Sequence, residues 1–342
     1  MASLTLSVLD QSPIRSGGSA GEALDETLRL AQYTESLGYT RFWVAEHHGS
    51  ASFAGCSPEV LLARIGAHTR RIRLGSGGVM LSHYSPYKVA ENFLLLQALY
   101  PHRIDIGLGR APGSDSPTAA ALAYGSPIGV EYFRSKLMDL MAFVLGEPAA
   151  TSAFRRVKAS PRTDAVPEFW LLGSSEQSAL YAAELGMRYS IAHFLNPKES
   201  QSLAEIYRAH FRPSATLAAP QVNVAVFVLC APTDEEAQAL GLTRDIWRLG
   251  LERGAPGPLP SIEEARAIVL TEDEKQLIAR RRQHALCGTP AQVGTQLRDL
   301  ARRHDTQELV ILSNCHDFSQ RLQSYALLAQ EFGLSPDEDG TV

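Results

Sequence analysis

The sequence predicts one α/β domain in which eight parallel strands close into a (β/α)8 barrel, the TIM-barrel fold, with insertions. Short apolar runs alternate with amphipathic stretches along most of the chain, and strands that alternate with helices pair in parallel. No long linker divides the 342 residues into halves. Eight strand–helix units of this kind suit a closed barrel of about 250 residues plus insertions.

The eight predicted strands are short apolar runs, which are typical of buried parallel strands. In chain order they are Leu4–Leu9, Phe42–Ala45, Ile72–Leu81, Arg103–Leu108, Phe169–Leu172, Tyr189–His193, Gln221–Leu229 and Leu309–Leu312. The third run is unusual for its glycines.

Amphipathic stretches between these runs predict the helices. In chain order they are Glu22–Leu37, Glu59–Thr69, Tyr87–Leu99, Val130–Leu145, Ser175–Leu185, Pro197–His210, Thr233–Leu251, Glu272–Ala285, Pro290–Arg303 and Phe318–Phe332. Gly38 stops the first helix, and Ser57 and Pro58 fit the N-cap and first position of the second. Ala111–Gly129 and Glu147–Val166 are predicted to be irregular insertions.

The barrel domain is predicted to span residues 1–334, followed by a flexible acidic tail over 335–342. Apolar residues make up 45% of the chain and charged residues 20%, the balance of a globular protein. The net charge of −5 argues against a general nucleic-acid binder and favours a small ligand. None of the four cysteines stands in a C-x-x-C pair, and no signal peptide or membrane span is evident. We therefore expect a cytoplasmic protein.

Polar and glycine-rich residues follow five consecutive predicted strands. Active sites of such barrels lie at the carboxyl ends of the strands, so these residues are the candidates for a site. They are Glu46–His48, Gly75–Gly78, Gly109–Gly113, Gly173–Ser175 and His193.

Each candidate has a functional and a structural interpretation. His47 is either a catalytic histidine or part of a buried polar cluster. Neighbouring strand residues point to opposite faces, so His47 and His48 are not expected to share a metal ion, and no metal site is predicted. Arg110 is either a surface residue or an anion ligand beside a glycine-rich turn. Ser175 opens a helix, either as a plain N-cap or as part of a phosphate site.

Together these residues resemble the bacterial luciferase-like flavin monooxygenase family, above all its single-subunit bacterial members. The resemblance runs from Leu6 to about Leu328. It rests on Phe42–His48, on Leu74–Leu81 leading into Ser85–Glu91, on Arg103–Arg110 and on Gly173–Gly186. It implies a barrel that binds FMN. Members of the family use reduced flavin and O2 to build a C4a-peroxyflavin, which oxidises a small organic substrate.

The resemblance also implies roles for particular residues. His47 matches the active-site histidine, and Gly77 and Gly78 match the strand against the isoalloxazine, where the family often has a non-proline cis peptide. The positions that match phosphate-binding residues are Arg110, Ser174, Ser175 and Ser178. Ser174 stands where luciferase has a carboxylate and Gly109 where it has a cysteine, which argues against light emission.

Partners follow from the same resemblance. It implies a homodimer packed through Ser57–Thr69 and Tyr87–Leu99, and reduced FMN supplied by a separate NAD(P)H:flavin reductase. The insertions Ala111–Gly129 and Pro256–Glu272 are candidates for a lid that keeps water out. Two alternatives stay open on the same fold: a deazaflavin (F420)-dependent oxidoreductase and a non-catalytic flavin-binding protein.

Overall fold

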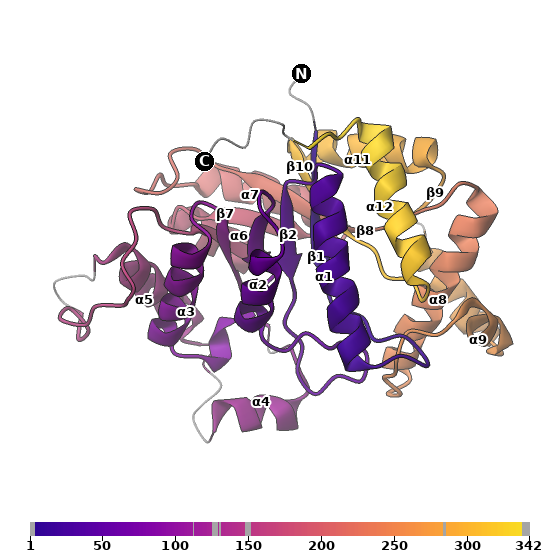
Figure 1. Cartoon of the computed structure of the whole chain (residues 1–342), viewed down its shortest axis with the longest axis horizontal. Coiled ribbons are helices and arrows are strands. Elements are labelled where there is room, and N and C mark those ends of the chain that lie inside the picture. Colours follow the sequence, from indigo (N-terminus) through magenta and orange to yellow (C-terminus); the bar gives the residue numbers. More distant parts are fainter. Residues whose placement is uncertain are drawn as a thin grey trace.

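The computed structural model describes residues 4–111, 113–124, 129, 131–147, 152–282 and 285–336. Within these residues ten strands form one parallel sheet, and eight of them close into a barrel that confirms the predicted (β/α)8 fold (Figure 1). Around the barrel the order is β1 (Thr5–Asp10), β2 (Arg41–Val44), β3 (Arg73–Ser76), β5 (Ile104–Gly109), β6 (Glu168–Gly173), β7 (Arg188–Ala192), β8 (Val222–Cys230) and β10 (Glu308–Leu312). The pairing of β10 with both β8 and β1 closes it.

Alternation along the strands sorts the apolar residues into two cores. Leu6 and Val8 of β1 face the helices and belong to the large outer cluster. Leu9 points to the other face and joins Trp43, Trp170 and neighbouring residues in a smaller cluster inside the barrel. Successive side chains of a strand point to opposite faces. In the barrel one face of each strand is covered by helices and the other faces the barrel interior, so both faces carry apolar residues.

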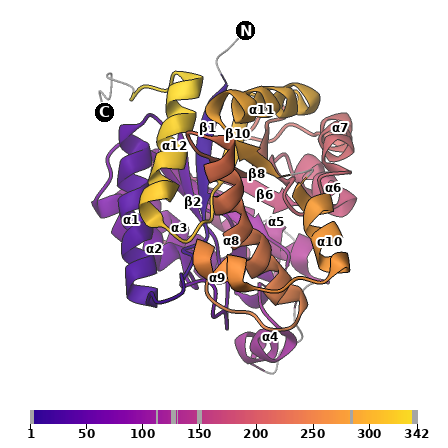
Figure 2. The ribbon, with the colours of Figure 1, turned by 90° about the vertical axis from the view of Figure 1, so that its right-hand side faces the viewer.

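Helices surround the barrel (Figure 2). The ring contains α1 (Ala20–Ser36), α2 (Pro58–Ala67), α3 (Pro86–Leu99), α5 (Phe133–Leu145), α6 (Glu176–Glu184), α7 (Ser200–His210), α8 (Asp234–Glu252), α11 (Pro290–His304) and α12 (Phe318–Phe332), with α10 (Glu272–Arg282) after α8. The bounds agree with the predicted ones to within about three residues. Among the described helices none is both long and apolar enough to cross a bilayer.

The structure also contains elements that the sequence did not predict. The third strand is interrupted, so that β4 (Val79–Met80) and the short 3-10 turn η1 (Leu81–His83) follow β3 separately. Strand β9 (Leu286–Gly288) pairs with the end of β8, between the predicted helices Glu272–Ala285 and Pro290–Arg303, where no strand was expected.

Two short helices lie inside predicted loops: α4 (Ser116–Ala123) and α9 (Ile262–Ala267). Each is capped locally, since Asp115 accepts a hydrogen bond from the Thr118 N–H and Ser261 forms a capping box with Glu264. In both views α4 lies beyond the barrel, apart from the ring of helices. The tail predicted over 335–342 lies, from 337 on, outside the described residues, as does Pro112.

Candidate functional site

A cavity of about 430 Å³ lies at the carboxyl ends of the barrel strands. The seven residues to which the family resemblance assigns a role all line it: His47, Gly77, Gly78, Arg110, Ser174, Ser175 and Ser178. Of the other candidates, Gly109, Gly113 and Gly173 line it as well, Glu46, His48 and Gly75 do not, and His193 lines a smaller pocket. The seven residues come from the segments after β2, β3, β5 and β6, so barrel closure brings together residues up to 131 positions apart. Their individual roles stay predictions.

His47 is the most unusual polar group of this cavity. Its ring packs against Phe53, with ring centroids 4.4 Å apart. Its Nδ1 is buried and has no hydrogen-bond partner among the described residues. Burial, followed by the charge of His48, lowers the pKa of His47 to about 4. The imidazole is therefore neutral at physiological pH and has a ring nitrogen available to a ligand.

His48 turns away from His47, as the alternation of side chains predicts. Its Nε2 lies 2.6 Å from Glu46 Oε1, and the Tyr84 hydroxyl donates to the same oxygen at 2.6 Å. Glu46 Oε2 accepts a hydrogen bond from the Met80 N–H at 2.9 Å. The fully buried Glu46 carboxylate thus connects the segment after β2 to β4 through hydrogen bonds. It thereby fixes the position of the adjacent residue, His47. No local pattern in the sequence points to Tyr84, because the contact depends on the fold.

The glycines form a wall of bare backbone on one side of the cavity. The peptide bond between Gly77 and Gly78 is cis. A Cβ atom on Gly77 would lie 2.3 Å from the Leu9 side chain, and one on Gly78 would lie 2.8 Å from the Gly107 carbonyl oxygen. At Gly78 the clash is with backbone, so a larger residue does not fit there, whereas at Gly77 it is with the end of the Leu9 side chain. A wall without side chains lets a flat ring approach the backbone closely.

Polar groups gather at the N-terminus of α6 on another side of the cavity. Ser175 is the N-cap and its side chain accepts a hydrogen bond from the Ser178 N–H, which shows the capping role, while the phosphate role stays a prediction. The Ser178 hydroxyl lies 2.9 Å from the Tyr189 hydroxyl. Arg110 contacts Gln177 in the first turn of the same helix. A helix N-terminus beside an arginine is a general phosphate-binding arrangement.

These features together fit FMN. The glycine wall accepts a planar ring, the partnerless Nδ1 of His47 can form a hydrogen bond to it, and the N-terminus of α6 with Arg110 suits a dianionic phosphate. A metal ion has no comparable place, since no three His, Cys, Asp or Glu side chains within the described part of the chain come together to hold one.

Motif analysis missed the apolar lining of the cavity. Its members are Leu9, Ala45, Met80, Leu172, Ala192, Phe194, Leu195 and Ala225. Missed as well was Gln11, whose side chain accepts a hydrogen bond from Asn314, 303 residues away. Strand alternation points to some of these residues, but only barrel closure shows that they meet.

The two predicted lid segments differ. Ala111 and Gly113 of the first insertion line the cavity. In the second, the Gly257 carbonyl accepts a hydrogen bond from Ser52 and Leu259 pairs with the backbone around Ile14. No residue of this second insertion lines the cavity, and the lid role of both insertions stays a prediction.

Sequence and structure comparisons identify the family of this chain. Residues 4–307 match the luciferase-like monooxygenase family. YwcH, an uncharacterised protein of Bacillus subtilis (strain 168), is 43% identical over 330 residues, covering 96% of this chain and 99% of that protein. The N-acetyl-S-alkylcysteine monooxygenase of the same strain is 38% identical over 328 residues, covering 95% and 97%. The crystal structure of apo-MsnO8 superimposes with a TM-score of 0.89 at 38% identity, covering 97% and 99%.

More distant structures share the fold alone and carry different cofactors. The oxygenating constituent of 3,6-diketocamphane monooxygenase from Pseudomonas putida, in complex with FMN, is 17% identical, with a TM-score of 0.69 and 98% of each chain covered. An F420-dependent secondary alcohol dehydrogenase is 11% identical, with a TM-score of 0.68, and the match covers 96% of this chain and 99% of that one. The family match spans residues 4–307, nearly the whole sequence. The chain therefore belongs to the luciferase-like monooxygenase family.

Proposed function

We propose that the protein is a flavin-dependent monooxygenase that uses reduced FMN and O2 to oxidise a small organic substrate. One observation supports this most strongly. A single cavity at the carboxyl ends of the strands is lined by a neutral, buried histidine, by a wall of glycine backbone and by an arginine beside the N-terminus of α6. Planar-ring binding, phosphate binding and proton transfer are thus available in one place.

In this proposal each group of residues has a separate task. Arg110, Ser175 and Ser178 hold the phosphate, with Ser174 contributing mainly its backbone N–H. Gly77 and Gly78 pack against the ring. When bound, reduced flavin activates O2 so that one oxygen atom reaches the substrate and the other leaves as water.

His47 has the remaining task, which is to hold or move a proton at the reacting face. Because its imidazole is neutral, one ring nitrogen donates and the other accepts. The apolar lining keeps water away from this face, and dry surroundings strengthen every hydrogen bond made there.

Thioethers are the first substrates to test, because the 38% identical relative from Bacillus subtilis is an N-acetyl-S-alkylcysteine monooxygenase. S-Benzyl-N-acetylcysteine, which carries a carboxylate, and its uncharged methyl amide are suitable test substrates, because they present the same sulfur atom and differ in charge. In the proposed reaction the sulfur gains one oxygen atom to form a sulfoxide.

The decisive experiment measures both cofactor binding and oxygen transfer. Reduced FMN, supplied by a separate flavin reductase with NADH, should support formation of a sulfoxide that carries one 18O atom from 18O2. Titrations with FMN and with F420 separate the two cofactors. Binding of reduced F420 without binding of reduced FMN would overturn FMN in favour of the deazaflavin alternative. FMN binding without oxygen transfer to any substrate tried would favour the non-catalytic flavin-binding protein.

Assembly as a homodimer is also a proposal. On α2 and α3 most apolar residues pack against the barrel, but Val60, Leu95 and Leu99 are 71%, 53% and 54% exposed. These exposed side chains lie on the two helices through which the dimer is expected to form. Light scattering at micromolar concentration should give the mass of a dimer, and a monomer mass would refute it. The need for a separate reductase and the cytoplasmic location stay predictions.

A further inference from the structure

A second, smaller pocket adjoins the cavity and is lined by arginines. Its volume is about 100 Å³, and it shares Phe194 and Leu195 with the main cavity. The rings of Phe194 and Phe227 meet edge to face with centroids 5.2 Å apart. The guanidinium carbon of Arg244 lies 3.7 Å from the centroid of the Phe227 ring. Phe194, which lines both pockets, is thus connected through Phe227 to Arg244 of α8.

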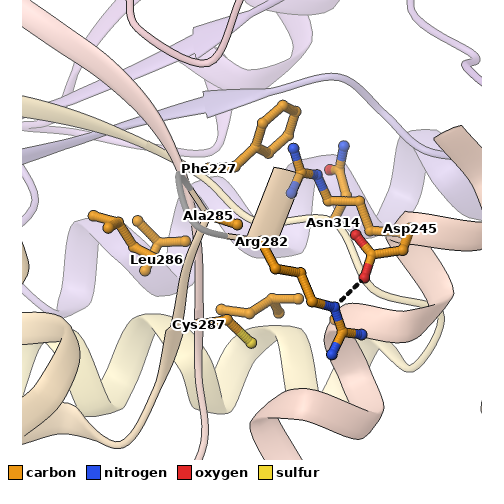
Figure 3. Close-up of a pocket in the computed structure, with 11 residues that line it drawn as sticks. Phe227, Asp245, Arg282, Ala285, Leu286, Cys287 and Asn314 are labelled. Carbon is orange, nitrogen blue, oxygen red and sulfur yellow. Dashed lines mark hydrogen bonds and ion pairs between the residues drawn. The ribbon is translucent and has the colours of Figure 1, made fainter. Parts of the chain in front are cut away.

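Three arginines line this pocket, Arg244, Arg248 and Arg281, and Arg282 lines the pocket next to it. Arg281 and Arg282 are neutralised within the protein. Arg282 donates to Asp245 at 2.5 Å, as Figure 3 shows in its view of the neighbouring pocket, and Arg281 forms an ion pair with Glu252. Asp245, which lines both pockets, is therefore already engaged.

Arg244 and Arg248 are the other two. Arg244 Nε is buried and has no hydrogen-bond partner in the part of the chain that the structure describes. Arg248 forms no ion pair with any described carboxylate. Burial lowers the pKa of Arg244 to about 10, although the charge of Asp245 acts in the opposite direction. A buried donor without a partner is costly unless a ligand supplies the acceptor.

We propose that this pocket, formed by Phe194, Phe227, Arg244 and Arg248, binds an anionic group of the substrate, a carboxylate in the first place. The planar guanidinium matches a carboxylate in a two-pronged geometry, and the aromatic pair suits the apolar part of the same molecule. The oxidisable atom of that substrate then lies in the main cavity. This inference rests on the proposed function of that cavity and narrows its substrates to small organic acids with an apolar part.

Phenylacetate and phenylacetamide test the charge requirement without any variant. They have the same ring and nearly the same shape, but only phenylacetate is an anion. Titration of the FMN-loaded protein by calorimetry should give phenylacetate a dissociation constant about ten- to a hundredfold lower, the range of a charge-assisted hydrogen bond. The Nε resonance of Arg244 in 15N-arginine-labelled protein should shift only with phenylacetate. Equal binding of the two compounds, or no binding of phenylacetate, would overturn the proposal.

Variants locate the anion. Arg244→Gln should abolish the preference for phenylacetate, Arg248→Gln should reduce it, and the affinity for FMN should not change. Arg244→Lys keeps the charge and provides a second variant if Arg244→Gln fails to fold. The matched control is Arg303→Gln, which removes the same charge from an exposed position on α11. If Arg303→Gln reduces the preference as much as Arg244→Gln, the pocket is not the binding site.

Further experiments distinguish a substrate anion from a free anion. They also test this pocket separately from the proposed monooxygenase function. Inorganic phosphate is tested as a competitor of phenylacetate. If phosphate has the same dissociation constant as phenylacetate, the pocket is a site for free anions and the substrate assignment is wrong. If the wild-type protein binds FMN and forms the sulfoxide but shows no preference for phenylacetate over phenylacetamide, only the pocket assignment is wrong. Phenylacetate binding that depends on Arg244 in a protein that does not bind FMN would contradict the proposed function and leave the anion site standing.

Discussion

Buried polar residues occur at both ends of the barrel. At the amino ends of the strands a network of buried charges has its partners within the protein, whereas at the carboxyl ends two polar residues have an atom without a partner in the described structure. At the amino ends of the strands, Asp105 is fully buried and accepts hydrogen bonds from Arg41, Trp43 and Arg73 at 2.5–3.0 Å. Arg41 also pairs with Glu168 and Glu308. Burial raises the pKa of Asp105, but Arg41 and Arg73 outweigh it and hold the pKa below its usual value.

At the carboxyl ends the buried polar atoms include two with no partner among the described residues, His47 Nδ1 and Arg244 Nε. Both line pockets. We infer that the buried charges at the amino ends, which the protein itself satisfies, support the fold, and that His47 and Arg244, whose unpartnered atoms lie beside pockets, are kept for ligands. Mutations at the two ends should therefore separate stability from activity.

The largest expected effect is on chemistry at the carboxyl end. His47→Ala should lower oxygen transfer to substrate by about 10²–10⁴-fold, the usual cost of losing a general acid or base. Hydrogen peroxide should be released in place of oxidised product, while FMN affinity changes little. The ratio of product to peroxide, with FMN binding measured on the same sample, checks this.

His48→Gln serves as the control for His47→Ala, since His48 turns to Glu46 and away from the cavity. It should keep oxygen transfer coupled to product. A His47→Ala protein that is destabilised yet couples oxygen to substrate as well as wild type would make His47 a core histidine.

At the amino end the expected effect is on stability alone. Asp105→Ala leaves Arg41 and Arg73 without their shared carboxylate, and breaking a buried ion pair typically costs about 3–5 kcal/mol. Urea unfolding followed by circular dichroism measures this. Asp299→Ala, which breaks an exposed pair with Arg302, should cost at most about 1 kcal/mol. If the two variants lose equal stability, the buried network does not support the fold as we infer.

A smaller effect is expected for cofactor binding. Arg110→Ala should weaken FMN binding about ten- to a hundredfold, because a hydrogen bond to a charged group contributes about 1.5–3 kcal/mol. Unfolding should hardly change, since the side chain contacts only Gln177 in the described structure. Ser174→Ala is the matched control and should change little, because that residue is expected to use its backbone N–H. An unaltered FMN dissociation constant in Arg110→Ala would place the phosphate elsewhere.

The smallest expected effect is that of pH on His47. With a pKa of about 4, the side chain stays neutral from pH 8 down to about pH 5, so the ratio of product to peroxide should be flat there. This pKa lies below the usual value near 6.5, so the contribution of His47 to stability is present above pH 6.5 and is lost as the pH falls toward 4. The ratio should be measured only where circular dichroism shows the fold intact. A step in the ratio near pH 6.5 that His47→Ala abolishes would contradict the low pKa.

Much of this architecture could be predicted from the sequence because its signals are local. Alternating apolar runs and helical periodicity predicted eight barrel strands and their helices. Strand alternation correctly separated His47 from His48. The seven residues predicted for the site line one cavity, since they lie within a predicted strand, just after one, or in the first turn of the helix that follows, and the carboxyl ends of parallel strands meet at one end of the barrel.

Other features were decided only by the tertiary structure. Asp105 meets Arg41, 64 residues away, and Gln11 meets Asn314. Arg244 reaches Phe227 across the gap between α8 and β8. No motif in the sequence indicates these contacts, because the partner of each residue is set by barrel closure and helix packing rather than by its neighbours in the chain. Whether a buried arginine is neutralised or left for a ligand therefore depends on distances that no local pattern contains.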